Sequence, residues 1–289
     1  MAELTDEERA ARRDGLGASD AAGIFGFGYR TPFGVWADKV WGAEVTVTPW
    51  MQRGHDLEPI IAAKYAAAAD AGHFVPGMRT DHPEVEWLYA TLDYRDINDG
   101  HPIETKAVDR FAAPDWGPSL DPDGVPDHYE LQLRQQVEVT GSDYGIVAAL
   151  FVETWELRWY RIEADPNVTA LLLDGSEAFW LNHVVARVPP PITNPDKDWE
   201  ALKSIPLDVE RTVDLPTESA DLVLEWRRAR GERKAAAKVE KECKAELARL
   251  MDGAGTGRID GEAAVTSSEH YRGKTLVRKL ADRTDWRHE

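Results

Sequence analysis

Cysteine, long apolar runs and positive charge are all scarce in this chain of 289 residues. The single cysteine excludes an intramolecular disulfide, and such cysteine usage is typical of a reducing cytoplasm. The N-terminal stretch MAELTDEERAARRDG is charged and lacks an apolar segment, so we expect no signal peptide. No apolar run approaches the ~20 residues of a membrane span. These absences predict a cytoplasmic protein without a membrane partner.

Acidic residues outnumber basic ones, 52 against 34, which gives a formal net charge of -18. Taken alone, this balance argues against a protein that coats nucleic acid non-specifically. It does not exclude a nuclease, whose carboxylates bind metal and whose basic residues can gather in one groove. The apolar share of 43% is that of a globular protein. The length suits one large domain with an extension, or two domains.

Residues 87–108 predict two strands joined by a tight turn. Thr91 and Asp93 share one face of the first strand, because side chains alternate across a strand. The Asn-Asp-Gly sequence at 98–100 supplies the turn, since these residues tolerate the positive φ of a tight hairpin. The second strand presents Glu104 on one of its faces.

Lys106 lies two residues after Glu104 and shares its face of the second strand. Separated carboxylates such as Asp93 and Glu104 can hold a divalent cation against a phosphate. A lysine beside them can orient or deprotonate a water, or neutralise charge in the transition state. For the E-x-K tripeptide alone, an exposed ion pair is the commoner interpretation. The neighbouring segments must decide between a metal site and an exposed ion pair.

The N-terminal region predicts two helices separated by a turn of small residues. Residues 4–14 carry a capping-box pattern. The turn at 15–20 leads into a second helix that Ser19 or Asp20 could cap. Small residues at a helix start let backbone N–H groups approach an anion, although a plain capped turn is the simpler alternative.

Residues 50–71 are rich in alanine and predict a further helix. Glu58 lies near its start, where the plain interpretation is a solvated first-turn acid favoured by the helix dipole. His55 could be a ligand, but a lone histidine is more often a hydrogen-bonded or surface residue. We expect one strand over 74–80.

The segment after the hairpin predicts a loop, a helix and two paired strands. Residues 109–126 are rich in Pro, Asp and Gly and indicate a mobile surface loop. A helix follows and ends at Gly141, with Gln132 and Gln136 one turn apart on one face. Simple exposure is the alternative to a role for these glutamines. The remaining predictions are strands over 144–151 and 156–162 and an amphipathic helix over 166–187.

Three consecutive prolines at 189–191 predict the end of the compact part. The chain would therefore comprise a core over 1–191 and an extension over 192–289. In the extension we expect a long helix over 217–251 with a coiled-coil-like apolar stripe.

Cys243 lies on that stripe, so we interpret it as a packing residue. A small β-hairpin is expected over 257–280. The basic residues of the long helix are a DNA contact or, more commonly, a solvated face; they are Arg227, Arg228, Arg230, Arg233 and Lys234.

Five short motifs in this order resemble the YqaJ-type viral recombinase family, relatives of phage lambda exonuclease within the PD-(D/E)xK nuclease superfamily. The motifs are GLGASDAA at 15–22, RGHDLEP at 53–59, ATLD at 90–93, ETK at 104–106 and LQLRQQVEVTG at 131–141. Each motif is unspecific alone, and the resemblance rests on their order. It implies an α/β fold, a mixed α+β sheet flanked by helices, with a PD-(D/E)xK restriction-endonuclease-like core and a helical C-terminal extension.

The resemblance also implies a role for each matching residue. The metal ligands would be Glu58, Asp93 and Glu104. Lys106 would be the active-site lysine, and Gln132 would position the water or the scissile phosphate. The residues implied to bind a 5′-terminal phosphate are Arg12 or Arg13, Ser19 and Thr91. The chain departs from the family pattern at Thr91-Leu92-Asp93, where a small residue and a proline are expected before the acid and a serine stands in the lambda enzyme.

The implied activity is a Mg²⁺-dependent exonuclease that degrades one strand of duplex DNA from its 5′ end. The 3′ tails would pass to a single-strand annealing protein for recombination in a bacterial host cell, which implies a phage or prophage origin. Oxygen ligands without Cys or His clusters favour Mg²⁺ or Mn²⁺ over zinc, and a pair of ions would flank the phosphate. The alternatives are an endonuclease or nickase with the same core, and a non-catalytic DNA-end-binding recombination protein.

The resemblance further implies a homo-oligomer, a ring-shaped trimer that would hold DNA despite the acidic surface. Such a ring needs a heterologous interface that closes on itself. Exposed tryptophans are suitable anchors for it, although core packing is the commoner use of any one. The tryptophans we expect at this interface are Trp36, Trp41, Trp50 and Trp116.

Overall fold

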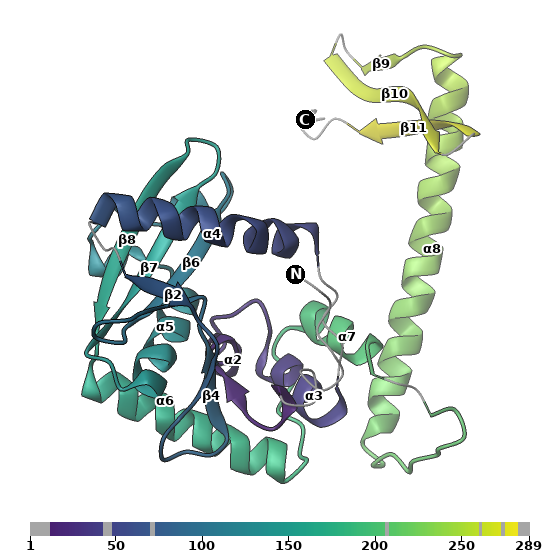
Figure 1. Ribbon diagram of the computed structural model, residues 1–289. Coiled ribbons are helices and arrows are strands. Elements are labelled where there is room, and N and C mark those ends of the chain that lie inside the picture. The colour runs from purple at the N-terminus through teal and green to yellow at the C-terminus, as the bar shows by residue number, and fades with distance from the viewer. Residues whose placement is uncertain are drawn as a thin grey trace. The chain divides into compact units, whose positions relative to one another are not determined.

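The computed structural model describes residues 12–42, 48–69, 73–205, 208–259, 262–272 and 275–282. Two compact units divide the chain between Asp208 and Val209. The helices of the first unit are α2 (Ala18–Ile24), α3 (Pro32–Trp41), α4 (Pro49–Ala69), α5 (Asp127–Thr140), α6 (Pro166–Phe179), which continues as the π-helical η3 (Trp180–Val185), and α7 (Pro195–Lys203), with short 3₁₀ turns η1 (Ala113–Asp115) and η2 (Pro122–Gly124). Its strands are β1 (Leu16–Gly17), β2 (Phe74–Pro76), β3 (Arg79–Asp81), β4 (Leu88–Thr91), β5 (Tyr94–Asp96), β6 (Pro102–Val108), β7 (Tyr144–Phe151) and β8 (Glu156–Glu163) (Figure 1).

The larger sheet has five strands in the order β2-β5-β6-β7-β8, and only the central pair β6 and β7 is parallel. A parallel pair needs a crossover, which α5 supplies. Alternate side chains of β7 pack against α4 on one face and against α5 on the other. Ile146 and Ala148 contact the α4 side through Ile61, whereas Val147 packs with Leu133 of α5. Because both faces of β7 are buried, its sequence is an almost continuous apolar run.

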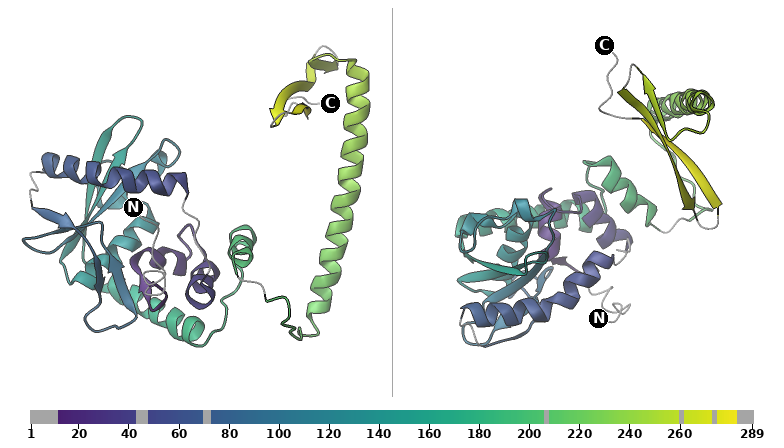
Figure 2. Two further views of the ribbon diagram at one scale, coloured as in Figure 1. Left: turned by 45° about the vertical axis from the view of Figure 1, so that its right-hand side comes forward. Right: turned by 90° about the horizontal axis from the view of Figure 1, so that it is seen from above.

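A second, smaller sheet has the order β1-β4-β3, with β1 parallel and β3 antiparallel to β4. Its core joins residues of α3 and α6, among them Trp36 and Phe179. Helix α5 contacts both sheets, since it packs on β4 as well as on β6 and β7. Figure 2 shows the same arrangement from two further directions. The helix that crosses between the two sheets therefore fixes the position of one sheet relative to the other.

Two segments that we expected as single strands each pass from one sheet to the other. Residues 74–81 form β2 and β3, and the first strand of the predicted hairpin is divided into β4 and β5. The backbone N–H of Gly77 donates to the carbonyl of Asp93 over 2.8 Å. A Cβ at Gly77 would lie 2.5 Å from the Leu92 carbonyl oxygen. Glycine is thus required where the two segments cross.

Residues 109–126 form an irregular segment, as expected of a loop, but part of it enters the core. Trp116 is buried, with its ring 5.6 Å from that of Tyr160 and 5.5 Å from that of Tyr129. A large aromatic side chain in the core holds this irregular segment against the sheet. Trp36 is buried as well, so neither tryptophan is available as an interface anchor. Trp41 and Trp50 are exposed, by 38% and 63%.

The first unit extends beyond the three prolines at which we expected the core to end. Helix α7 packs on α3, and Asp198 within it is fully buried. The carboxylate of Asp198 accepts hydrogen bonds from the Thr31 hydroxyl and from the backbone N–H groups of Thr193 and Asn194. The proline segment is therefore a bend within the unit.

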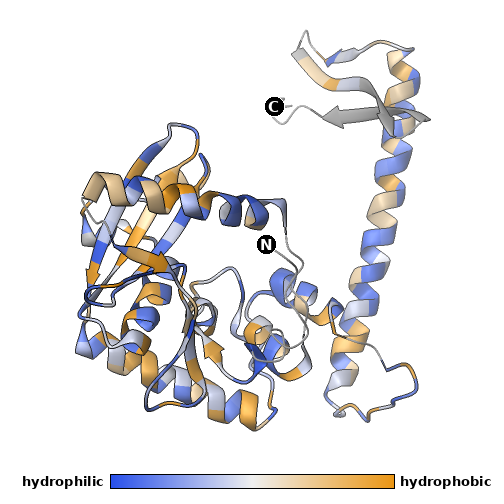
Figure 3. Cartoon of the chain, viewed as in Figure 1, coloured by the Kyte–Doolittle hydropathy of each residue, from blue (hydrophilic) through white to orange (hydrophobic). Residues whose placement is uncertain are grey.

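The second unit consists of α8 (Ser219–Met251) and a sheet of the strands β9 (Thr256–Ile259), β10 (Glu262–Arg272) and β11 (Thr275–Asp282) in the order β11-β10-β9. A three-stranded antiparallel sheet thus stands where we expected a hairpin. Polar and apolar residues mix along α8 (Figure 3), and none of its residues is buried. Cys243 is exposed, so its interpretation as a packing residue is wrong. Among the described helices, none is both long and apolar enough to cross a membrane.

The basic residues of α8 are exposed, as both alternatives for this cluster require. Arg228 pairs with Glu225 and Glu232 on the same helix. The predicted N-terminal helix over 4–14 lies mostly outside the described residues. Of the part that is described, Arg12 and Arg13 are helical.

Candidate active site

Glu104 on β6 is the centre of a buried polar cluster and is only 2% exposed. Its Oε1 accepts hydrogen bonds from Nζ of Lys106 over 2.5 Å and from Nε2 of Gln132 over 2.6 Å. Its Oε2 accepts one from Nε2 of Gln136 over 2.5 Å. The carboxylate is held by three donors and cannot rotate freely.

Local structure explains why these four side chains meet. Glu104 and Lys106 share a face of β6 because strand side chains alternate, and that face is the one that α5 covers. Gln132 and Gln136 lie one turn apart on α5 and point to that face. The structure therefore joins the predicted E-x-K pair to both glutamines, and the alternative of simple exposure is wrong for Gln136, which is fully buried.

Asp93 reaches the same cluster through the register of the hairpin. Tyr94 pairs with Ile103 in the antiparallel ladder, so the next position places Asp93 opposite Glu104. The chain leaves the sheet here, and Oδ2 of Asp93 accepts hydrogen bonds from the backbone N–H of Thr105 over 2.8 Å and from its hydroxyl over 2.9 Å. A carboxylate thus takes the place of a backbone acceptor at the end of the ladder.

The charges of the cluster are strongly coupled. Burial and, after it, the neighbouring charge of Glu104 raise the pKa of Asp93 to about 7 against the opposing effect of Lys106. Burial by itself would lower the pKa of Lys106, but the carboxylates of Glu104 and Asp93 outweigh it and raise that pKa above its ordinary value. Two carboxylates that repel each other in a buried place would be relieved by a divalent cation, and carboxylate oxygens suit Mg²⁺. The residues present therefore fit the predicted metal.

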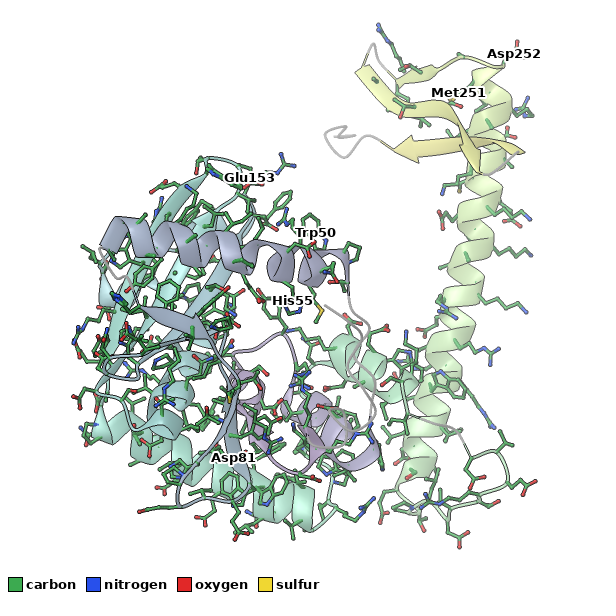
Figure 4. The ribbon with its side chains drawn as sticks, in the orientation of Figure 1. Trp50, His55, Asp81, Glu153, Met251 and Asp252 are labelled. Atoms are coloured by element: carbon green, nitrogen blue, oxygen red, sulfur yellow. The ribbon has the colours of Figure 1, made fainter. Side chains whose placement is uncertain are left out.

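Glu58 approaches this cluster from α4. Its charge contributes to the raised pKa of Asp93, although less than Glu104 does. Oε1 of Glu58 lies 2.7 Å from Nδ1 of His55, so His55 is a hydrogen-bonded histidine, in line with the commoner alternative. Figure 4 shows His55 and Trp50 on the first half of α4.

Within the described chain, a different group brings three ligand atoms within 4.8 Å of one another: Asp96, Asp99 and His101. These residues form the turn between β5 and β6, and sequence reasoning overlooked them. The carboxylate of Asp96 accepts the N–H of Asn98 over 2.7 Å, and that of Asp99 lies 2.6 Å from Nδ1 of His101. Side-chain hydrogen bonds of this kind are usual in turns and explain the closeness of the group.

The residues implied to bind a 5′-phosphate lie at the end of the smaller sheet. Gly17 of β1 pairs in parallel with Tyr89 of β4, so the residues that follow each of them emerge on one side. Ser19 and Thr91 each lie two positions after this pair, Ser19 on α2 and Thr91 at the end of β4, and both are exposed. Both residues therefore follow the same end of the parallel pair.

The two candidate arginines differ in their surroundings. The backbone carbonyl of Arg12 accepts hydrogen bonds from Nζ of Lys39 over 2.7 Å and from the Tyr89 hydroxyl over 3.2 Å. The guanidinium of Arg13 lies against Gly42 at the C-terminal end of α3, where an added Cβ would be 2.5 Å from its Cζ. Cations are favoured at such helix ends. Arg13 is therefore engaged by α3, whereas Arg12 is anchored beside β4.

The turn before α2 depends on one buried acid, Asp20. Its Oδ2 accepts a hydrogen bond from the backbone N–H of Gly17, the N-cap of α2, over 2.9 Å. It also forms ion pairs with Lys39, over 2.7 Å, and with Arg30. Burial would raise the pKa of Asp20, but these two cations outweigh it and lower the pKa to about 2.

Sequence reasoning missed three contributors to the cluster. The spacing of Gln136 placed it on the same helix face as Gln132, but no role was assigned to it. Tyr129, three residues before Gln132 on α5, places its ring centroid 4.7 Å from Nζ of Lys106. Thr105 gave no signal, because its contact with Asp93 arises only where the chain leaves the ladder.

Comparisons with known proteins concern the family and the fold. Residues 9–143 match the family model described as YqaJ-like viral recombinase domain. The alkaline exonuclease LHK-Exo from Laribacter hongkongensis is 21% identical, with a TM-score of 0.53 over 64% of this chain and 94% of that chain. The structure of LHK-Exo in complex with dAMP is 22% identical, with the same TM-score and coverage. At such identity the likeness shows the fold, and it confirms the predicted mixed α/β architecture.

A search of curated proteins gave no match. The family match and the shared fold confirm the resemblance drawn from the five motifs. Residues 9–143 of the chain therefore carry a YqaJ-like viral recombinase domain.

Proposed function

We propose that the protein is a Mg²⁺-dependent exonuclease that degrades one strand of duplex DNA from its 5′ end and leaves 3′ single-stranded tails. The observation that carries this proposal is the buried carboxylate of Glu104, fixed by Lys106 and two glutamines and placed beside Asp93. The similar fold of an alkaline exonuclease supports the nuclease class.

Asp93, Glu104 and Glu58 are the residues that would hold the metal. When bound, Mg²⁺ lowers the pKa of the attacking water and stabilises the leaving 3′ oxygen, and two ions would flank the scissile phosphate. Mn²⁺ would substitute, because it accepts the same oxygen ligands.

Lys106 is suited to neutralising charge on the phosphate. Its raised pKa keeps the ammonium group protonated beside Glu104, which favours electrostatic stabilisation over proton acceptance. Gln132 contacts both groups, through Nε2 to Glu104 and through Oε1 to Nζ of Lys106 over 3.4 Å. It would therefore orient the lysine and the carboxylate together.

The 5′-terminal phosphate would be bound by Arg12, Ser19 and Thr91. In support, Ser19 and Thr91 are exposed and follow the paired strands β1 and β4, and the backbone of Arg12 bonds Tyr89 of β4. Charge-assisted bonds from a guanidinium to a phosphate are among the strong hydrogen bonds. We favour Arg12 over Arg13 because Arg13 lies on the end of α3.

A cleavage assay on three DNA substrates tests this function. Linear duplex labelled at the 5′ end or at the 3′ end should be shortened from the 5′ end with Mg²⁺ and left intact with EDTA. Covalently closed circular duplex should stay intact. Nicking of the circle would instead establish the endonuclease alternative, and binding of ends without cleavage would establish a non-catalytic end-binding protein.

The oligomeric state belongs to the same proposal. A homotrimeric ring would keep an acidic protein on DNA, and the exposed Trp41 and Trp50 are its remaining aromatic anchors. Light scattering at micromolar concentration should give three times the chain mass. A single-chain mass with full activity would contradict the ring. The single-strand annealing partner and the bacterial cytoplasm as location follow from the same family reasoning.

A further inference from the structure

Gln135 is a fully buried polar residue on α5, between the two glutamines that hold Glu104. Its Nε2 donates to the backbone carbonyl of Leu16 over 3.1 Å and to that of Tyr89 over 3.0 Å. Two carbonyl oxygens can be satisfied only by the NH₂ group, so the orientation of the amide is determined. One side chain thus joins α5 to both β1 and β4.

The two carbonyls belong to the strands that precede the predicted phosphate-binding residues. Leu16 precedes Ser19 by three positions and Tyr89 precedes Thr91 by two. Ser19 lies on α2 directly after β1, and Thr91 is the last residue of β4, which runs parallel to β1. The amide of Gln135 therefore fixes the strand segments that lead to the two hydroxyls.

The neighbouring residues of the same helical turn fix the other half of the site. Gln132 and Gln136 bond the two oxygens of Glu104. Gln135 and Gln136 are adjacent in sequence and both are fully buried. Gln135 bonds strands of the smaller sheet, whereas Gln136 bonds Glu104 in the larger sheet.

We propose that Gln135 is a positioning residue that sets the place of the 5′-phosphate pocket relative to the metal-binding carboxylates. This inference rests on the proposed function, since it requires that Arg12, Ser19 and Thr91 bind the terminal phosphate. Without the amide, two buried carbonyls lose their donor and the ends of β1 and β4 shift. A misplacement of about 1 Å can reduce a rate by about 100-fold, so the benefit of a terminal phosphate would be lost.

The test compares two matched variants, Gln135→Met and Gln136→Met. Both replace a buried amide on one helical turn by an apolar side chain of similar length. The measured quantity is kcat/KM on duplex with a 5′ phosphate divided by that on duplex with a 5′ hydroxyl. Gln135→Met should lower this ratio about tenfold or more, towards one, as expected for lost charge-assisted contacts. Gln136→Met should lower kcat on both substrates and leave the ratio as in the wild type.

The wild-type ratio separates the two ways of failing. A wild-type ratio of one overturns the phosphate pocket of the proposed function, and the role of Gln135 with it. A wild-type ratio well above one that Gln135→Met leaves unchanged overturns the role of Gln135 alone. If the methionine variant does not fold, Gln135→Glu takes its place, because it keeps the size of the side chain but has no NH₂ group to bridge both carbonyls.

Discussion

The two central carboxylates differ in what surrounds them. Glu104 is enclosed by three donors, whereas the side-chain carboxylate of Asp93 accepts hydrogen bonds from Thr105 alone among the described residues. Asp93→Asn should therefore lower kcat by more than about 100-fold, the upper loss typical for residues that only support a metal ligand. Its thermal midpoint should stay near that of the wild type. If the variant keeps a large part of the activity, Asp93 is not a metal ligand.

Glu104→Gln should lose stability together with activity. The new NH₂ group would face donors that now meet carboxylate oxygens, namely those of Lys106, Gln132 and Gln136. Leaving buried donors without acceptors costs about 1–3 kcal/mol. Urea unfolding of this variant beside Asp93→Asn measures the difference. Equal stability of the two would mean that the donors around Glu104 find other partners.

The buried Asp20 should make the fold sensitive to acid. Its pKa in the fold, about 2, lies below the ordinary 3.8, so the ionised group stabilises the fold at higher pH and this contribution is lost as the pH falls through that range. A shift of this size corresponds to about 2 kcal/mol. The free energy of unfolding of Asp20→Asn should therefore fall below that of the wild type near pH 7, and the difference should shrink towards pH 2. A difference that stays constant with pH would show that Lys39 and Arg30 do not act through the charge of Asp20.

At the scale of elements, the crossing at Gly77 decides where Asp93 lies. Gly77→Ala would press a Cβ against the Leu92 carbonyl and should destabilise the fold by about 1–3 kcal/mol, the usual cost of overpacking. Gly54→Ala on α4 is the control, since an added Cβ there meets nothing within 4 Å and alanine favours a helix by about 1 kcal/mol. In denaturant unfolding, Gly54→Ala should have the highest free energy of unfolding, the wild type an intermediate one and Gly77→Ala the lowest. If Gly77→Ala is as stable as the wild type, the crossing is looser than this contact implies.

The same crossing marks where prediction from sequence reached its limit. Alternation placed Glu104 beside Lys106, and helical spacing placed Gln132 beside Gln136, because both patterns are local. The passage of one chain segment between two sheets is not local, since it depends on Gly77 and Leu92 meeting from different segments. Trp116 shows the same limit, because a segment rich in proline and glycine gives no sign that an aromatic residue will enter the core.

At the scale of the whole molecule, α7 predicts where the chain can be cut. A chain of residues 1–208 should keep the thermal midpoint of the first unit, whereas residues 1–191 should not, because that cut removes the buried Asp198 and uncovers α3. Loss of about 2 kcal/mol of hydrogen bonding would lower the midpoint by about 4–8 °C. Calorimetry of the two chains measures their thermal midpoints. Equal midpoints would mean that the first unit ends at the three prolines, as the sequence predicted.

Helix α8 has 33 residues, none of them buried. Apart from a few half-buried residues such as Leu247 and Met251, it is supported by its own turns and by exposed ion pairs such as Arg228 with Glu225. Exposed pairs of this kind contribute little and weaken with salt. In heavy water the backbone amide hydrogens of α8 should exchange with deuterium through the opening of single turns, and this exchange should be faster at high ionic strength. The amide hydrogens of β7 should exchange only when the whole first unit unfolds.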